Sequence, residues 1–222
     1  MSEKISATHS FTGITRRLLG IGLLLAIAAM LGHLRSTLAT TRAKTVWSFE
    51  SDQPGKIAKG FTAEVGTWEV ERDRENNVLA QKAKNDDGTF NVVLVDDTHF
   101  KNVDLSVRMK AVAGTLDQGG GLVWRARDKG NYYIARYNPL EDNFRVYNVQ
   151  GGKRTQFQSA KIAGDTKWHT LRVTMTGAQI TCYLDGTKYL EVEDSTFVEA
   201  GKIGLWSKAD AQSYFDDLTA GE

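Results

Sequence analysis

The chain has 222 residues, with 28 Lys and Arg against 27 Asp and Glu and a formal net charge of +1. Such a balance exerts no general electrostatic pull on polyanions, so the sequence predicts no nucleic-acid partner. A single cysteine, Cys182, excludes an intrachain disulfide, and the fold must be stabilised by its core alone.

The N-terminal segment has the features of an export signal. Arg16 and Arg17 precede an apolar run at residues 18–31, and a polar stretch rich in Ser and Thr follows. A membrane-spanning helix needs about 20 apolar residues, a length that this run reaches only by recruiting residues 32–34. We therefore expect an apolar export helix within residues 1–44, either a cleaved signal peptide or an uncleaved membrane anchor. The remainder would then be exported to the periplasm or the extracellular space.

Residues 45–222 are predicted to form one all-β domain. Turn signals recur about every 8 to 12 residues, and the segments between them alternate polar and apolar side chains. So many short antiparallel strands imply two sheets packed face to face or a closed barrel. The predicted strands, in chain order, are residues 46–50, 67–72, 78–82, 90–95, 104–112, 121–127, 132–137, 144–149, 154–160, 169–176, 179–184, 189–193, 202–207 and 213–218.

The alternation also predicts which side chains face the core. In the strand at 132–137 either face could be the inner one, and we choose Tyr133, Ala135 and Tyr137 because this choice avoids burying Arg136. The other residues predicted to face inward are Leu122, Trp124, Phe144, Val146, Leu171, Val173, Met175, Ile180, Cys182, Leu184, Ile203 and Leu205.

The opposite face of the central strands carries arginines and aromatic rings. If these strands adjoin, Arg125, Arg136 and Arg145 form a row, and neighbouring cations repel one another unless acids or a ligand lie between them. Guanidinium groups beside rings suit a polyhydroxylated or carboxylated ligand such as a sugar. The alternative is a solvated face neutralised by nearby acids. The residues predicted to bind carbohydrate are Arg125, Tyr132, Arg136, Arg145, Tyr147, Trp206 and Lys208.

Four strand-and-turn motifs point to a known superfamily. They are found at residues 66–70, at 120–125, at 168–173 with 184–186, and at 201–206 with 215–218. Together they resemble the concanavalin A-like lectin/glucanase superfamily. Within it the chain is similar to laminin G-like domains and to the 3-keto-disaccharide hydrolase domain, which is related to family 16 glycoside hydrolases. The resemblance implies a two-sheet antiparallel β-sandwich of the jelly-roll type.

Catalytic motifs are missing. Family 16 hydrolysis needs carboxylates in the order Glu-x-Asp-x-x-Glu on one strand face, and the sequence lacks this motif as well as Gly-x-Ser-x-Gly. We therefore favour a noncatalytic carbohydrate-binding module. If the chain is instead a hydrolase of a 3-keto-disaccharide or related sugar, Glu141 or Asp142 is the best-placed general acid or base. A protein-binding scaffold of the cell envelope is a further alternative.

The resemblance also implies a metal site, because jelly rolls of this kind often hold a structural Ca²⁺ between their first and last strands. The matching acids are Glu50, Asp52, Asp216 and Asp217. Carboxylate oxygens are the ligands that Ca²⁺ prefers. Solvated acids at a strand end explain Asp216 and Asp217 equally well.

Overall fold

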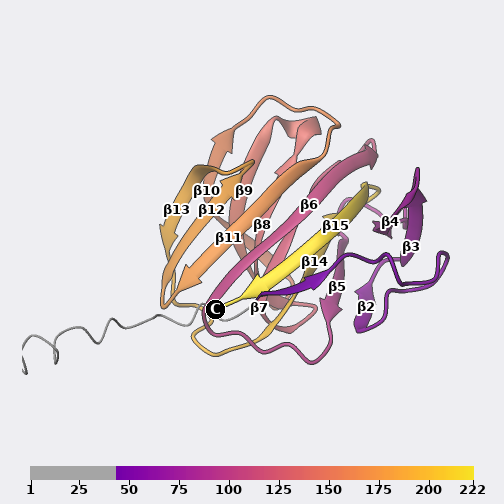
Figure 1. Ribbon diagram of the computed structural model, residues 1–222. Helices are drawn as coiled ribbons and strands as arrows, with labels where there is room; N and C mark the ends of the chain where they lie inside the picture. The colour runs from indigo at the N-terminus through magenta and orange to yellow at the C-terminus, as the bar shows by residue number, and fades with distance from the viewer. Residues whose placement is uncertain (1–43) are drawn as a thin grey trace, which may run out of the picture. The chain divides into compact units, whose positions relative to one another are not determined.

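The computed structural model describes residues 44–222, which fold into a sandwich of two antiparallel β-sheets (Figure 1). The predicted all-β, two-sheet architecture is therefore confirmed. The export helix expected within residues 1–44 lies outside the described residues. In the part that the structure describes, no helix is both long and apolar enough to cross a membrane.

The first sheet has eight strands in the order β13-β12-β11-β6-β15-β4-β3, and β1 pairs with β15. Both ends of the described chain lie in this sheet, because Thr45 of β1 pairs with Ala220 of β15. Its strands are β1 (Thr45–Trp47), β3 (Trp68–Asp73), β4 (Asn76–Gln81), β6 (Val103–Ala113), β11 (His169–Thr176), β12 (Gln179–Leu184), β13 (Thr187–Glu193) and β15 (Gln212–Gly221).

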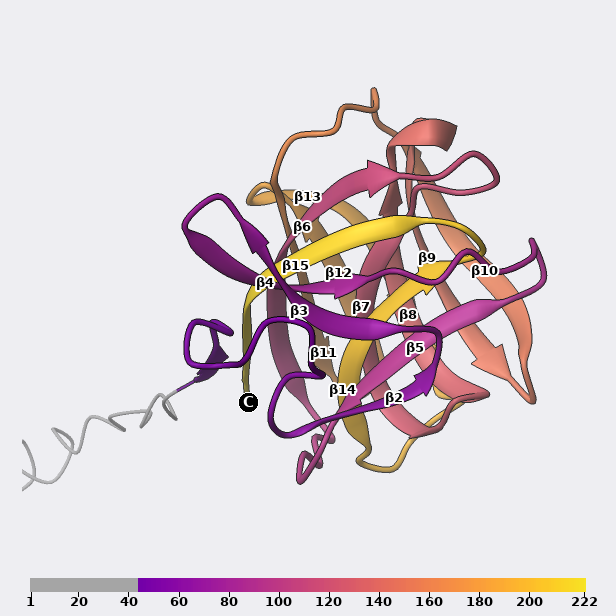
Figure 2. The same ribbon diagram turned by 90° about the vertical axis from the view of Figure 1, so that its right-hand side faces the viewer.

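The second sheet has seven strands in the order β10-β9-β8-β7-β14-β5-β2. A short 3-10 turn, η1 (Pro139–Glu141), joins β8 to β9. Figure 2 shows the two layers side by side, with β4, β15 and β6 in one and β5, β14 and β9 in the other. The strands are β2 (Phe61–Val65), β5 (Phe90–Val95), β7 (Gly120–Asp128), β8 (Asn131–Asn138), β9 (Asn143–Gln150), β10 (Lys153–Lys161) and β14 (Lys202–Lys208).

The main core fills the space between the sheets and contains every side chain that the alternation predicts to face inward. Tyr133, Ala135 and Tyr137 belong to it, so the inner face chosen for β8 is confirmed. Trp124 stacks on Tyr133 with ring centroids 5.5 Å apart. Cys182 is fully buried among these residues, and burial raises the pKa of its thiol. The predicted inward orientation of Cys182 is therefore confirmed.

A second apolar cluster lies on the other face of the second sheet. Its members belong to β5, β7, β8, β9 and β14 and are almost completely shielded from water, although none of the strands in residues 44–222 forms a further layer over them. We call this surface the concave face. Its side chains are Phe90, Val92, Leu94, Val123, Tyr132, Ile134, Arg136, Arg145, Tyr147, Val149, Arg154, Trp206 and Lys208.

Candidate functional site

Strong curvature of the second sheet creates the concave face. The guanidinium carbon of Arg154, on β10, lies 5.3 Å from the ring centroid of Phe90, on β5. Four strands separate β10 from β5, and a flat sheet would hold them about 24 Å apart at roughly 4.8 Å per strand. The sheet must therefore curl so that its edges approach each other across the concave face.

Arg154 covers the floor of this concavity. Its guanidinium carbon lies 4.5 Å from the ring centroid of Tyr147 and 5.7 Å from that of Trp206, in addition to its contact with Phe90. The three rings form an aromatic cage around the cation, an arrangement that stabilises guanidinium groups. One ring of the cage is itself held in place: Trp206 Nε1 donates a hydrogen bond of 3.1 Å to the hydroxyl of Tyr132.

An arginine–glutamate network lies along the same face. Arg136 and Arg145 are cross-strand neighbours, and both donate to Oε2 of Glu141, at 2.8 and 3.0 Å. Arg136 Nη1 also donates to Oδ1 of Asn143 at 3.2 Å, and Arg145 Nε donates to Oγ of Ser159 at 3.1 Å. Glu141 thus offsets the repulsion between the two paired arginines.

This network does not fit the catalytic role predicted for Glu141. Burial alone would raise the pKa of its carboxyl group, but hydrogen bonds from Arg136 and Asn143 and the charges of Arg136 and Arg145 lower it to about 2. A general acid or base works best with a pKa near the operating pH. Glu141 therefore remains an ionised partner for arginines at neutral pH.

Asp142 has a structural role. It ends η1 with φ of 51°, and its carboxylate accepts a hydrogen bond of 2.8 Å from the backbone N–H of Gly164. Its carbonyl oxygen accepts a second bond, of 2.9 Å, from Ile162. Asp142 therefore ties the loop after β10 to the turn between β8 and β9. Its role as a general acid or base stays a prediction.

Two residues that the sequence reasoning missed belong to the site, Asp117 and Arg154. Asp117 precedes β7 and is fully buried; its Oδ1 accepts from Asn138 Nδ2 at 3.1 Å. Burial raises its pKa, although the charge of Arg136 opposes this effect. No motif marks Asp117 in the sequence. Arg154 could have been found, because it pairs with Val149 and so shares a face with Tyr147.

Several buried polar atoms of this site lack hydrogen-bond partners among residues 44–222. They are Oδ2 of Asp117, Nε of Arg136, the hydroxyl of Tyr147 and Nη1 of Arg154. Their charges act on one another, which places them in one electrostatic neighbourhood. Because buried polar groups are nearly always hydrogen-bonded, such a concentration marks a place where a ligand or ordered water completes the structure.

Lys208 lies on the same face, two residues after Trp206 on β14. Its ammonium group pairs with the exposed carboxylate of Asp87. Its charge also lowers the pKa of Asp117, against the larger effect of burial. Lys208 therefore lies close enough to Asp117 to belong to the predicted site.

Arg125 does not join the row predicted for the three arginines. A β-bulge between Trp124 and Asp128 interrupts the alternation of β7, and Arg125 has φ of 47° there. Its side chain is buried and donates to the carbonyl oxygens of three loop residues, Lys101 at 2.8 Å, Gly177 at 2.7 Å and Phe197 at 2.7 Å. Arg125 is therefore an anchor for loops, which corrects its placement in the site.

The predicted aromatic platforms are on the concave face but are not open to solvent. Tyr132 and Trp206 are 0% exposed and Tyr147 is 2% exposed. They form the floor of the concavity because the sheet curls and Arg154 lies across them.

The four acids predicted as Ca²⁺ ligands do not form a metal site. Asp216 Oδ2 accepts from Asn76 Nδ2 at 2.7 Å, and Asp217 Oδ2 from Arg108 Nη1 at 3.4 Å. The Glu50 carboxylate accepts from the N–H of Asn77, and Asp52 Oδ1 from that of Lys59. In residues 44–222 no three acidic, His or Cys side chains converge as metal ligands. These residues do not fit the ion.

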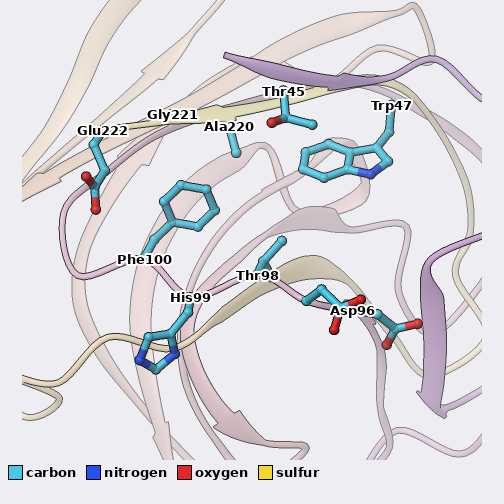
Figure 3. A pocket seen from close by; sticks show the side chains of 10 residues that line it. Thr45, Trp47, Asp96, Thr98, His99, Phe100, Ala220, Gly221 and Glu222 are labelled. Carbon is cyan, nitrogen blue, oxygen red and sulfur yellow. The ribbon is translucent and has the colours of Figure 1, made fainter. Parts of the chain in front are cut away.

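A pocket of about 500 Å³ opens elsewhere, near the end of the chain. Figure 3 shows the rings of Trp47 and Phe100 in its wall, with Asp96 and His99 nearby. Asp96 already accepts a hydrogen bond of 2.8 Å from Oγ1 of Thr62. The described residues that line this pocket include none with an unpaired buried side-chain polar atom, so the concave face is the stronger candidate in spite of the pocket's volume.

Comparison with solved structures finds the same fold in carbohydrate-active proteins. The carbohydrate-binding module CBM66 from Bacillus subtilis is 20% identical, with a TM-score of 0.63 over 77% of this chain and 99% of that one. A GH43 protein, BlXynB, from Bacillus licheniformis is 15% identical, with a TM-score of 0.53 over 73% of this chain and 39% of that one. A putative glycosyl hydrolase from Parabacteroides distasonis is 12% identical, with a TM-score of 0.51 over 75% and 89%.

No curated protein matches the chain. The two-sheet fold is the one that the resemblance to the concanavalin A-like superfamily implies. A family model covers almost the entire sandwich: residues 48–220 match the 3-keto-alpha-glucoside-1,2-lyase-like domain, and the chain belongs to this family.

Proposed function

We propose that this chain is a noncatalytic carbohydrate-binding module and that the concave face is its binding site. The observation that carries the proposal is the group of unpaired buried polar atoms on Asp117, Arg136, Tyr147 and Arg154 beside an aromatic cage. Sugars present hydroxyl groups that donate and accept hydrogen bonds, and C–H faces that pack on rings. The site offers partners for both.

The exposed rim of the concavity supports the same assignment. Glu141 and Arg145 are partly exposed, and both already take part in charge-assisted hydrogen bonds that fix their positions. Preorganised polar groups around an apolar floor are typical of small-molecule sites. The structural similarity to CBM66 and to glycosyl hydrolases shows a shared fold and is consistent with this proposal.

The test is binding of the sandwich domain to a glycan array, followed by titration calorimetry on any hit. Tyr147→Phe removes one unpaired hydroxyl without changing the ring, and we expect it to weaken binding about tenfold, as a lost hydrogen bond of about 1.4 kcal/mol would. Tyr189→Phe is the matched control, because Tyr189 lies exposed on β13 of the first sheet. Equal affinity of wild type and Tyr147→Phe would place binding elsewhere and refute the site.

One observation favours a second candidate, an enzyme that acts on a 3-keto-glucoside or a related modified sugar. Burial raises the pKa of Asp117, as a general acid requires, and the Oδ2 atom of this carboxyl group has no partner in the described part of the chain. Release of reducing sugar or of an unsaturated product from a bound glycan, abolished in Asp117→Asn, would establish turnover. Binding without any product supports the noncatalytic module.

We also propose that residues 1–44 export the module. The basic flank and the apolar run at residues 18–31 support this assignment. Mass spectrometry of the protein from fractionated cells checks it: a new N-terminus near residue 44 indicates a cleaved signal, and intact Met1 in the membrane fraction indicates an anchor. Intact chain confined to the cytoplasm would contradict export. The scaffold alternative has no specific observation in its favour.

A further inference from the structure

The concave face contains more fixed positive than negative charge. Its cations are Arg136, Arg145, Arg154 and Lys208. Glu141 is shared by Arg136 and Arg145, and Asp87 pairs with Lys208. Asp117 is the third acid, and burial raises the pKa of its carboxyl group, which disfavours its charged form. Four cations therefore face three acids even when Asp117 is ionised.

The excess charge resides on Arg154. In residues 44–222 no carboxylate lies within salt-bridge distance of its guanidinium group, whose contacts are with the rings of Phe90, Tyr147 and Trp206. Its Nη1 atom is buried and has no hydrogen-bond acceptor. Asp117 and Glu141 act on this charge only from beyond salt-bridge distance. A desolvated charge without a direct counter-ion is costly, and cation–π contacts offset only part of that cost. An anionic group that pairs with Arg154 would remove the remainder.

Several unpaired donors lie near Arg154. The guanidinium carbons of Arg154 and Arg136 lie 4.5 and 5.8 Å from the centroid of the same ring, that of Tyr147. Nη1 of Arg154, Nε of Arg136 and the hydroxyl of Tyr147 each lack a partner in the described residues. Two guanidinium groups and a phenol beside one ring offer several donors, as the lone pairs of a carboxylate require.

We propose that the sugar bound by the concave face is acidic, a uronic acid whose carboxylate pairs with Arg154 and accepts from Tyr147 and Arg136. This inference rests on the carbohydrate-binding function proposed above and names its ligand class. A carboxylate is planar and meets the guanidinium fork with two parallel hydrogen bonds, which a neutral hydroxymethyl group cannot do. A neutral sugar would leave the charge of Arg154 unpaired.

Arg154 is also placed to reach a ligand. It lies near the start of β10, an edge strand, and it is partly exposed, as is Phe90 of the same cage. Because rings rather than a carboxylate hold it, its side chain can leave the cage without breaking a salt bridge. A ligand carboxylate can therefore pair with Arg154 beside Tyr147 without first displacing an acid of the protein.

The experiment compares acidic trisaccharides with their own neutral counterparts by titration calorimetry. The probes are trimers of galacturonate, glucuronate and mannuronate, the same trimers after reduction of the carboxyl group, and a sulfated neutral trimer. We expect at least one acidic trimer to bind at least tenfold more tightly than its reduced form. Arg154→Gln should abolish this preference, and Arg154→Lys, which keeps the charge but not the fork, should keep part of it.

Arg74→Gln is the control, since Arg74 is an exposed arginine in the turn between β3 and β4 and lies away from the concave face. Thermal unfolding of each variant verifies that the sandwich is intact. Equal binding of acidic and reduced trimers that is still weakened by Tyr147→Phe would overturn the uronate assignment and leave the carbohydrate function in place. No binding of any glycan would overturn both. Tighter binding of the sulfated trimer would overturn the choice of a carboxylate.

Discussion

Arg125 shows how one side chain in this fold can hold several loops together. Its three donors reach the carbonyl oxygens of Lys101, Gly177 and Phe197, which lie in three separate connections between strands. Burial lowers the pKa of the guanidinium group, so the charge is retained against a desolvation penalty. The charge-assisted hydrogen bonds offset that penalty.

We predict that Arg125→Met is among the most destabilising single changes in the sandwich. It leaves three carbonyl oxygens without their donor, and the expected loss in the free energy of unfolding is about 3–5 kcal/mol. The measurement is urea unfolding monitored by tryptophan fluorescence. Arg127→Met is the control, because Arg127 only stacks on Phe197, at 5.1 Å, and its removal should cost less than about 1 kcal/mol. A similar loss in both variants would disprove the anchoring role.

The same residue marks a limit of the sequence pattern. Strict alternation along 121–127 places Arg125 on the same side of the sheet as Arg145. This prediction is wrong because a β-bulge between Trp124 and Asp128 shifts the register of β7, and no sequence motif reveals the bulge. On β8 and β9, where the pairing is regular, the predicted neighbours Arg136 and Arg145 do lie opposite each other. Local periodicity is therefore reliable only where the strand has no bulge.

At the level of elements, a histidine at the start of β11 joins the loop before this strand to the turn between β12 and β13. His169 Nδ1 lies 2.7 Å from Oδ2 of Asp185, in the β12–β13 turn, and Nε2 lies 3.0 Å from Oδ1 of Asp165, in the loop after β10. Burial alone would lower the pKa of His169, but its hydrogen bonds to Asp185 and Asp165 and their charges raise it. When it is protonated, the imidazole bridges two carboxylates.

The pKa of His169 is higher in the folded than in the unfolded protein, so protonation of His169 stabilises the fold. This stabilisation is fully present below the unfolded-state pKa of about 6.5 and is lost as the pH rises through the folded-state pKa. We predict that the stability difference between wild type and His169→Gln is largest near pH 5.5 and shrinks towards pH 8.5, in urea unfolding at each pH. His99→Gln serves as the control, since His99 is exposed in the loop between β5 and β6. A difference that stays constant with pH would rule out the bridge.

Most elements could be predicted from the sequence because alternating polar and apolar residues, separated by turn residues, indicate short antiparallel strands. The exception is β2, a short strand at the sheet edge with exposed Thr62 and Ala63, whose pattern is too weak to distinguish from a loop. The complete burial of Tyr132 and Trp206 could not be predicted either. Alternation assigns a residue to a face, whereas the curvature that buries this face results from the packing of the whole sheet.

At the scale of the molecule, segments distant in sequence build the candidate site. Its residues come from four separate parts of the chain: Phe90 from β5, Asp117 from the loop before β7, Arg154 from β10 and Trp206 from β14. The site therefore exists only when the sandwich is closed. Asp210 contributes to this closure from the turn between β14 and β15. Its carboxylate accepts from the backbone N–H groups of Thr115, Leu116 and Asp117, which fixes the loop that carries Asp117.

Closure of the first sheet depends in the same way on β1. This strand pairs with the last strand, Trp47 opposite Leu218, and the ring of Trp47 contacts Phe61 with centroids 6.3 Å apart. Among the described residues the core begins at Phe49 and ends at Ala220. We predict that a fragment of residues 44–222 unfolds in one cooperative transition. A fragment of residues 49–222 lacks a short strand and a packed ring, so its free energy of unfolding should be lower by about 1–3 kcal/mol. Urea unfolding followed by both fluorescence and circular dichroism measures this difference. Two separate transitions in the longer fragment would mean that the sheets unfold independently, and equal stability of the two fragments would mean that β1 adds nothing to closure.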